Sequence, residues 1–363
     1  MKIMIYATPE SKGHHYIYFY TIVHAIQEKM PEVDIVAVLP EICDEIKCRQ
    51  LLIEGINWGT KSFIEYFKLM QSFLKIVKDE KPDCIHIQCG DNFYRFFGLG
   101  FRRLRKYNPV ITFHHMRRSK LRDISLHCIF NNIAYGIVHT ESLRRMLLEM
   151  GINNVMHIEY PQFQKIKCPS PTNAKKNLGL SEKVPVLLAL GATRDDKGLD
   201  ILLDALNLVK YNFQLLIAGQ ESSFTESYID KHTQKYAEKV VKKLKFLDDY
   251  EFAECLSAAD FVILPYKKCF DGASGPLGEG VIQGKTIIGP NHGSLGDIIT
   301  RNHLGYVFEA ENVQSLSKII NLALTETQRH DSAYVNYQRE LSPELFISRY
   351  VALFEKVTAM RKE

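Results

Sequence analysis

The sequence predicts an α/β protein with two domains, each built on a doubly wound parallel sheet. Short apolar segments alternate with helix-length segments along most of the 363 residues, which is the pattern of parallel strands joined by crossover helices. The alternation stops near residue 165 and then starts again. A chain of this length is long for one hydrophobic core and suits two.

The N-terminal half carries strands that are apolar throughout, as expected when helices cover both faces of a sheet. A helix is expected over residues 16–29, after a loop over residues 8–15. The expected strands are residues 2–7, 33–39, 84–88, 110–113 and 136–139. Together these segments predict a Rossmann-like domain over residues 1–165.

The second half follows a segment, residues 165–172, that contains two prolines and has no hydrophobic period. The pattern then predicts another Rossmann-like domain over residues 166–342. Its expected strands are residues 184–190, 213–218, 261–265 and 286–288, and its expected helices are residues 198–209 and 276–283. Apolar side chains at helical spacing in residues 343–363 predict a final helix that returns to the first domain. Two such domains facing each other would form a central cleft, with ligands at the carboxyl ends of the strands.

The composition excludes several classes of protein. No segment reaches the roughly 18 unbroken apolar residues that span a bilayer, and the chain runs from Met1 and Lys2 directly into a strand, without the apolar stretch of a secretory signal. We therefore expect a cytoplasmic protein. The eight cysteines form no C-x-x-C pair, which argues against a zinc ribbon or a redox motif.

The net charge of +4 has one concentrated source. From Arg95 to Arg122 there are nine basic side chains and no acidic one, and aromatic residues such as Phe96 and Phe97 lie among them. Aromatic side chains beside cations suit the interface of an anionic bilayer, so peripheral contact with the inner face of a membrane is one interpretation. A core helix with a solvated basic face is another. No nucleic-acid-binding motif accompanies the charge, so we expect no nucleic-acid partner.

One candidate ligand loop, Gly191 to Gly198, follows the first strand of the second domain. It carries Arg194 and Lys197 and leads into a helix, whose N-terminus offers free N–H groups and partial positive charge. Arginine binds phosphate bidentately and lysine acts as a point charge, so the loop favours an anionic ligand. The alternative is an ordinary turn whose charges Asp195 and Asp196 neutralise.

A second candidate loop, residues 268–279, follows the apolar strand 261–265 and enters another helix. Pro276 suits the first helical position, and Ser274 or Gly275 suits the cap before it. Glu279 falls close to the helix start, where a carboxylate can bind a ligand or can interact favourably with the helix dipole.

Together the two loops resemble those of GT-B glycosyltransferases, in particular glycosyltransferase family 4. In that family a glycine turn with Arg and Lys precedes an acidic pair spaced E-x₇-E, and here Asp271 and Glu279 have that spacing. The turn from Gly293 to Asp297 and the segment from Gly305 to Phe308 also resemble family motifs. The resemblance covers most of residues 184–325.

The resemblance implies a role for each matching residue. Arg194 and Lys197, after Gly191, would hold the donor diphosphate; Glu279 would accept hydrogen bonds from the ribose, and Asp271 would contact the donor sugar. Helix N–H groups around the phosphate would come from the residues that begin the second helix, namely Ser274, Gly275, Pro276 and Leu277. The sequence departs from the family pattern at Ala192, where the usual arginine is absent, and at Asp271, which is Asp rather than Glu.

The N-terminal domain, on the acceptor side, matches less closely. Gly13 lies in a loop that resembles the glycine-bearing loop near the transferred sugar, and His114 ends a strand as the sugar-contacting histidine of the family does. A structural role for His114 is equally compatible with its local sequence. His86 is expected to face the sheet or to support the cleft.

The activity implied is retaining transfer of a hexosyl group from a UDP- or GDP-sugar to a saccharide or lipid-linked acceptor, as in surface polysaccharide or glycolipid synthesis. No cofactor and no metal are expected, because Arg194 and Lys197 would take the place of a metal and no D-x-D triplet occurs. An inactive GT-B binding protein and a sugar-nucleotide 2-epimerase remain as alternatives.

Overall fold

The computed structural model describes residues 1–8, 14–56, 58, 62–114, 116, 119–163, 168–270, 274–326 and 330–360. The chain divides into two compact units. The first consists of Met1–Tyr160 together with Pro343–Glu363, and the second is Pro161–Ser342. The first unit therefore ends slightly before residue 165, and the C-terminal segment belongs to it.

The first unit is built on a seven-stranded parallel sheet with the order β3-β2-β1-β4-β5-β6-β7. Its central strands are fully or almost fully buried, which explains their unbroken apolar sequence. The strands are β1 (Lys2–Tyr6), β2 (Asp34–Leu39), β3 (Arg49–Leu52), β4 (Cys84–Ile87), β5 (Pro109–Phe113), β6 (Tyr135–Val138) and β7 (Val155–His157).

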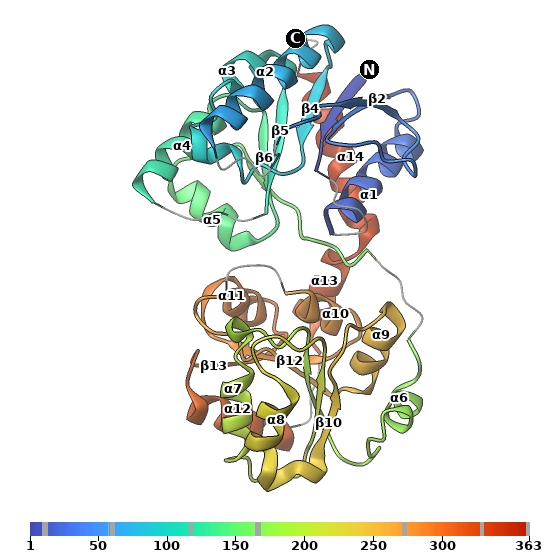
Figure 1. Cartoon of the computed structure of the whole chain (residues 1–363), viewed down its shortest axis with the longest axis vertical. Coiled ribbons are helices and arrows are strands. Elements are labelled where there is room, and N and C mark those ends of the chain that lie inside the picture. Colours follow the sequence, from blue (N-terminus) through green and yellow to red (C-terminus); the bar gives the residue numbers. More distant parts are fainter. Residues whose placement is uncertain are drawn as a thin grey trace. The chain divides into compact units, whose positions relative to one another are not determined.

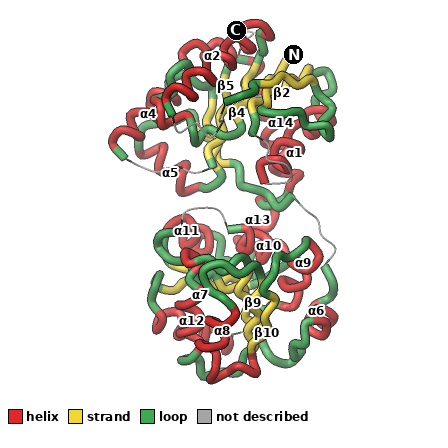
Figure 2. The backbone as a smooth tube through the Cα atoms, viewed as in Figure 1, coloured by secondary structure: helices red, strands yellow, loops and turns green. Residues whose placement is uncertain are grey.

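Helices lie on both sides of this sheet (Figures 1 and 2). One side carries α1 (His14–Lys29) and the C-terminal helix α14 (Pro343–Ala359), which pack against each other. The other side carries α2 (Phe63–Glu80), η1 (Phe93–Phe96), α3 (Phe101–Leu104), η2 (Arg105–Tyr107), α4 (Lys120–Phe130) and α5 (Glu141–Glu149). The hydroxyl of Ser62 caps α2, and that of Ser119 caps α4, so the sequence itself fixes where both helices begin.

Helix α14 is tied to the first unit by buried hydroxyl groups. The Tyr350 hydroxyl contacts the Tyr18 hydroxyl of α1 and lies 3.1 Å from Thr112 Oγ1 of β5. Thr112 Oγ1 lies 3.0 Å from His86 Nε2 of β4. Burial lowers the pKa of His86 to about 3, with a further contribution from His139, so this imidazole is neutral at physiological pH. His86 is thus a buried residue of the sheet that helps to hold Thr112 and α14 in place, in agreement with the expectation of a structural role.

The second unit is built on a six-stranded parallel sheet with the order β10-β9-β8-β11-β12-β13. The strands are β8 (Val186–Leu190), β9 (Gln214–Ala218), β10 (Val240–Lys243), β11 (Phe261–Ile263), β12 (Thr286–Pro290) and β13 (Gly305–Phe308). Two hydrophobic cores lie on opposite faces of this sheet.

Each core of the second unit is completed by its own set of helices. One set is α6 (Pro171–Asn177), α9 (Asp249–Ala258), α10 (Gly275–Ile282), α11 (Gly293–Arg301) and α13 (Ser332–Glu340). The other set is α7 (Leu199–Leu206), α8 (Glu226–Thr233) and α12 (Val313–Thr325). Two short 3-10 segments, η3 (Asp195–Lys197) and η4 (Gln234–Lys239), precede α7 and β10.

The predicted fold class, two doubly wound parallel-sheet α/β domains, is confirmed. In both sheets the strand order reverses next to the first strand, between β1 and β4 and between β8 and β11. Ligands of open α/β sheets bind at such a reversal, at the carboxyl ends of the strands. The fold therefore directs attention to the loops that follow β8 and β11.

Replacement of Tyr350 by phenylalanine is expected to destabilise the protein by about 1–3 kcal/mol, because it leaves the buried Tyr18 and Thr112 hydroxyls without this partner. Urea unfolding followed by circular dichroism measures the effect. Tyr20→Phe, at an exposed position of α1, is the matched control and should leave the midpoint unchanged. Equal midpoints for the two variants would contradict a stabilising role for the Tyr350 hydroxyl.

Candidate functional site

The two candidate loops leave adjacent strands of the second unit. Strands β8 and β11 pair in parallel register, with Leu187 opposite Phe261 and Leu188 opposite Val262. Both strands therefore end at the same edge of the sheet. The loop after β8 continues into α7 on one face, whereas the loop after β11 continues into α10 on the other. This divergence opens room for a ligand at the point where the strand order reverses.

Two glycines of the first loop allow close contacts, one with the Lys197 side chain and one with the backbone after β11. Gly191 has a φ of 109°, and a Cβ at this position would collide with the Lys197 ammonium group. Gly198 has a φ of 64°, and a Cβ there would collide with the carbonyl oxygen of Pro265, after β11. The Thr193 hydroxyl anchors the middle of the loop by donating to the Phe224 carbonyl at 2.7 Å. The loop is thus held against the end of β11, with Lys197 against its first glycine.

Lys197 is the cation of this loop that is best placed for an anionic ligand. Its Nζ lies 5.6 Å from the centre of the Tyr266 ring. Burial lowers the pKa of Lys197, and the nearby positive charge of Arg194 lowers it further. Within the part of the chain that the structure describes, Lys197 forms no ion pair with a carboxylate. The charge of Asp196 opposes these effects only in part, so an anion beside Lys197 would offset the cost of its burial and its repulsion by Arg194.

Arg194 is already paired. Its guanidinium binds the Asp196 carboxylate bidentately, with distances of 2.9 Å from Nε and 2.7 Å from Nη2. Asp195 is paired as well, to Lys267 at 2.7 Å. The alternative suggested by the sequence, that the two aspartates neutralise the charge of the loop, thus describes Arg194 but not Lys197. The Arg194 side chain is 53% exposed, so its ion pair is in contact with solvent and can exchange for a ligand at small cost.

The second loop meets the first through Tyr266. The Tyr266 hydroxyl lies 3.3 Å from Ser274 Oγ, and Ser274 caps α10 by accepting the Leu277 amide at 3.3 Å. Pro276 has no amide hydrogen, and the Leu277 amide is engaged by this cap. Among the four candidate residues of the helix start, Ser274 and exposed Gly275 therefore hold the amides that a ligand can approach. The expected contribution of Pro276 and Leu277 is limited to shaping the turn.

Glu279 lies in the second turn of α10 and is half-buried. Burial raises the pKa of its carboxyl to about 7, and the charge of Asp249 adds to the shift. A carboxylate whose ionised form is destabilised in this way gains from hydrogen-bond donors such as ligand hydroxyl groups. Two other predicted site residues, Asp271 and Gly13, lie outside the described residues.

His114 belongs to a different group of residues, in the first unit. It follows β5, its Nε2 lies 3.0 Å from the Gln88 carbonyl oxygen, and its backbone amide donates to Asp91 at 3.3 Å. The carbonyl can only accept, so Nε2 carries the proton. The His139 ring lies 5.0 Å away and the Tyr18 ring 5.5 Å away. These rings and hydrogen bonds fix the orientation of His114 at the carboxyl edge of its sheet.

Three residues of these sites were not among the predicted site residues. Tyr266 supports Lys197, Asp196 neutralises Arg194, and His139 packs beside His114. Tyr266 and His139 each lie just after the end of an apolar strand. Arg194 and His114 were predicted from the same kind of position, so the sequence did carry a signal for these two residues. The sequence suggested that Asp195 and Asp196 neutralise the loop, but which cation each of them pairs with depends on side-chain orientation and could not be predicted.

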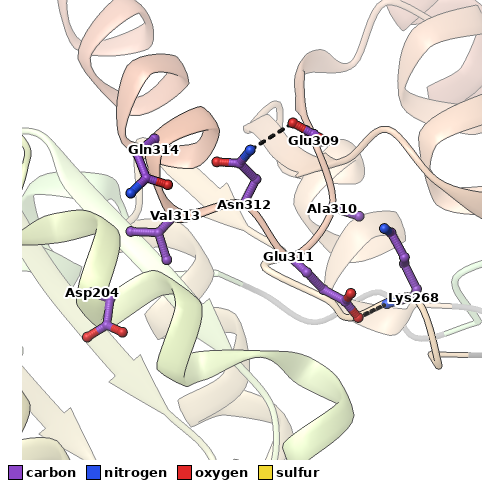
Figure 3. Close-up of a pocket in the computed structure, with 8 residues that line it drawn as sticks. All are labelled: Asp204, Lys268, Glu309, Ala310, Glu311, Asn312, Val313 and Gln314. Carbon is purple, nitrogen blue, oxygen red and sulfur yellow. Dashed lines mark hydrogen bonds between the residues drawn. The ribbon is translucent and has the colours of Figure 1, made fainter.

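A hollow of about 630 Å³ in the second unit is lined by Lys268, the first residue of the second candidate loop, and by residues outside both loops (Figure 3). Asp204 of α7 and the segment after β13 line it, and Glu311 accepts the Lys268 amide at 2.9 Å. Its lining includes three carboxylates, those of Asp204, Glu309 and Glu311, and one cation, Lys268. This balance of charge disfavours a diphosphate, so the smaller site around Lys197 is the better candidate for an anion.

Two further observations concern the described residues only. No three His, Cys, Asp or Glu side chains among them gather closely enough to hold a metal ion. None of the helices they form has the length and apolar content that crossing a membrane requires.

Glu279→Gln is expected to raise the melting temperature at pH 8 and to leave it unchanged near pH 4.5. The folded-state pKa of about 7 exceeds the ordinary value of 4.5, so the stabilising contribution of the protonated carboxyl is fully present below 4.5 and is lost as the pH rises through 7. Differential scanning fluorimetry across this range measures the difference. Glu182→Gln removes an exposed carboxylate of the same unit and should show no such trend. A pH-independent effect of Glu279→Gln would contradict the raised pKa.

Comparison with known proteins agrees with the geometry. Residues 171–340 match the model of the family described as glycosyl transferases group 1. An uncharacterized glycosyltransferase of Methanocaldococcus jannaschii is 28% identical over 143 residues, covering 39% of this chain and 39% of the relative, so the chain spans well under two thirds of that relative's length. A lipopolysaccharide 1,2-N-acetylglucosaminetransferase of Salmonella typhimurium is 25% identical over 274 residues, covering 69% of this chain and 66% of the relative.

Solved structures extend the similarity over the whole chain. Anabaena HepE in complex with UDP superposes with a TM-score of 0.72 at 13% identity, covering 98% of this chain and 100% of that one. At this identity the likeness concerns the fold. Residues 171–340, almost all of the second unit, are thus similar to group 1 glycosyl transferases, and the chain has the GT-B fold.

Proposed function

We propose that this protein is a glycosyltransferase of family 4 type. It transfers a hexosyl group from a UDP- or GDP-sugar to a saccharide or lipid-linked acceptor, with retention of configuration and without a metal, in surface polysaccharide or glycolipid synthesis. The observation that carries the proposal is the position of Lys197. Its half-buried ammonium follows β8, at the strand-order reversal of the second unit, and lies near the ring of Tyr266, whose hydroxyl is 3.3 Å from the Ser274 cap of α10.

The leaving group explains why this arrangement suits the reaction. Cleavage of the sugar–phosphate bond leaves negative charge on the nucleoside diphosphate, and cations and N–H dipoles fixed in advance lower the barrier most. Lys197 and the amides of Ser274 and Gly275 would stabilise this charge. Arg194 would join them by exchanging the Asp196 carboxylate for a phosphate. Gly191 would let the phosphate approach the loop closely.

The remaining roles follow the resemblance. Glu279 would accept hydrogen bonds from the ribose, Asp271 would contact the transferred sugar, and Gly13 and His114 would lie near that sugar. In the proposed step the acceptor oxygen bonds to the anomeric carbon while the carbon–phosphate oxygen bond breaks on the same face. The acceptor proton passes to the leaving phosphate oxygen. No cofactor takes part.

The comparisons support the coarser parts of this proposal. The relatives include glycosyltransferases, and HepE was solved with UDP bound. The finer parts, which are the donor sugar, the acceptor, retention and independence of metal, are expectations from the resemblance.

The activity test uses the purified full chain with a panel of UDP- and GDP-sugars, and release of nucleoside diphosphate is measured. We expect turnover that is unaffected by chelation of divalent cations. Lys197→Ala should lower it by about 100-fold or more, as removal of one stabilising donor does in other enzymes. Lys183→Ala, at an exposed position of the same unit, should have no effect.

Two outcomes would contradict the proposed activity. Tight nucleotide binding without hydrolysis or transfer would favour an inactive binding protein. Conversion of a sugar nucleotide to its 2-epimer would favour the epimerase.

Asp196→Asn is expected to strengthen UDP binding by up to about fivefold, because an exposed ion pair of at most about 1 kcal/mol no longer competes for Arg194. Isothermal titration calorimetry measures the change, which should shrink as the salt concentration rises. Asp230→Asn breaks a comparable exposed pair, with Lys242, and serves as the control. Weaker UDP binding by Asp196→Asn would show that the carboxylate helps the site rather than competing with the ligand.

A further inference from the structure

We propose that the first unit docks on an anionic lipid bilayer through one surface, which we call the docking surface. It comprises the first two turns of α2 and of α4 and the connection from η1 to α3. Its apolar members are Phe63, Ile64, Phe67, Phe97, Leu99, Leu121 and Ile124. The inference goes beyond the proposed activity and does not depend on it.

The apolar side chains of the docking surface are unusually exposed. On α2, Phe63 is 54% exposed and Ile64 65%, and on α4, Leu121 is 67% exposed and Ile124 54%. Both helices already pack another apolar face into the core, where α2 contributes Phe73 among others. The exposed residues therefore form a second apolar face on each helix. A helix of a globular protein normally keeps that face polar.

The elements that expose these side chains are in contact with one another. The Phe63 ring lies 6.4 Å from that of Phe67 and 6.1 Å from that of Phe96 in η1. The Tyr66 hydroxyl of α2 donates to the Leu99 carbonyl at 2.7 Å. On the other side, α4 packs against η1. Contacts thus run from α2 through the η1–α3 connection to α4.

Basic side chains accompany this surface. Arg95, Arg102, Arg103 and Lys120 are exposed on the same elements. No acidic residue occurs from Arg95 to Arg122. The nearest carboxylates on α2 and α4 are Glu65 and Asp123, and both are half-buried. The positive charge therefore dominates the elements that expose the apolar side chains, and an anionic partner is favoured.

This combination of chemistry fits a bilayer better than other partners. A second copy of the chain, bound through the same surface, would bring the two basic clusters together. Nucleic acid would match the charge and could stack on the exposed phenylalanines, but it would leave the aliphatic side chains Ile64, Leu121 and Ile124 without an apolar partner. A bilayer with anionic headgroups accommodates both kinds of side chain, because apolar residues enter the acyl boundary and cations stay at the headgroups.

Co-sedimentation with lipid vesicles tests the proposal. The full chain should bind vesicles made of equal parts phosphatidylglycerol and phosphatidylcholine and should not bind pure phosphatidylcholine. The double variant Phe63→Ser/Phe67→Ser should lose at least tenfold in binding, and Arg102→Gln/Arg103→Gln should lose a similar amount and show a weaker dependence on salt. Phe246→Ser/Tyr250→Ser removes exposed aromatic residues from the second unit and is the matched control, with no expected change.

A spectroscopic readout separates insertion from loose attachment. The chain has one tryptophan, Trp58, which is buried. In a Phe67→Trp variant, anionic vesicles should shift the emission to shorter wavelength, and brominated acyl chains should quench it. A Tyr250→Trp variant should show neither effect.

Three results would overturn the proposal. One is absence of binding to anionic vesicles, or equal binding by the Phe63→Ser/Phe67→Ser variant and the unmodified chain. Another is self-association of the unmodified chain in solution that this variant abolishes. The third is RNA binding tighter than vesicle binding and lost with the same residues. None of these results bears on nucleotide release, so failure here is distinguishable from failure of the proposed activity.

Discussion

The candidate donor site depends on the parallel pairing of β8 with β11. Because these two strands are neighbours in the sheet but not in the sequence, their following helices, α7 and α10, pack on opposite faces. The two loops therefore start side by side at the same edge of the sheet and then diverge toward opposite faces. Their polar side chains lie at that shared edge. Tyr266 joins them by contacting Lys197 in one loop and Ser274 in the other. Without this strand order, the same motifs would not converge.

Ion pairs within the protein neutralise part of the charge at this site. Asp196 holds Arg194 and Asp195 holds Lys267, whereas Lys197 remains against an aromatic ring with its pKa lowered by burial. The exposed ion pairs cost little to break, while the half-buried ammonium gains most from an incoming anion. A diphosphate could thus bind Lys197 directly, whereas Arg194 would first have to release Asp196. We therefore expect Lys197 to contribute more than Arg194 to binding of the diphosphate.

The central strands and the positions of the two loops were predictable from the sequence. The edge strands β3, β7 and β10 and the side-chain contacts within the loops were not. Strands β1, β4 and β5 are buried on both faces, so their apolar runs were visible. Strands β3, β7 and β10 lie at sheet edges and are only partly buried. Their mixed composition gave no comparable signal. Likewise, spacing pointed to Lys197 and Glu279, but only side-chain positions could reveal that Asp196 pairs with Arg194 and that Tyr266 lies beside Lys197.

The return of α14 to the first unit has a consequence for the order of assembly during synthesis. The second unit is one continuous stretch, Pro161–Ser342, so all of its residues have left the ribosome before α14 is made. The first unit emerges earlier but lacks α14, whose Tyr350 contacts Tyr18 and Thr112. Until the residues of α14 are made, the face of its sheet beside α1 is incomplete. The unit whose synthesis begins first is therefore completed only after the whole of the second unit has been made.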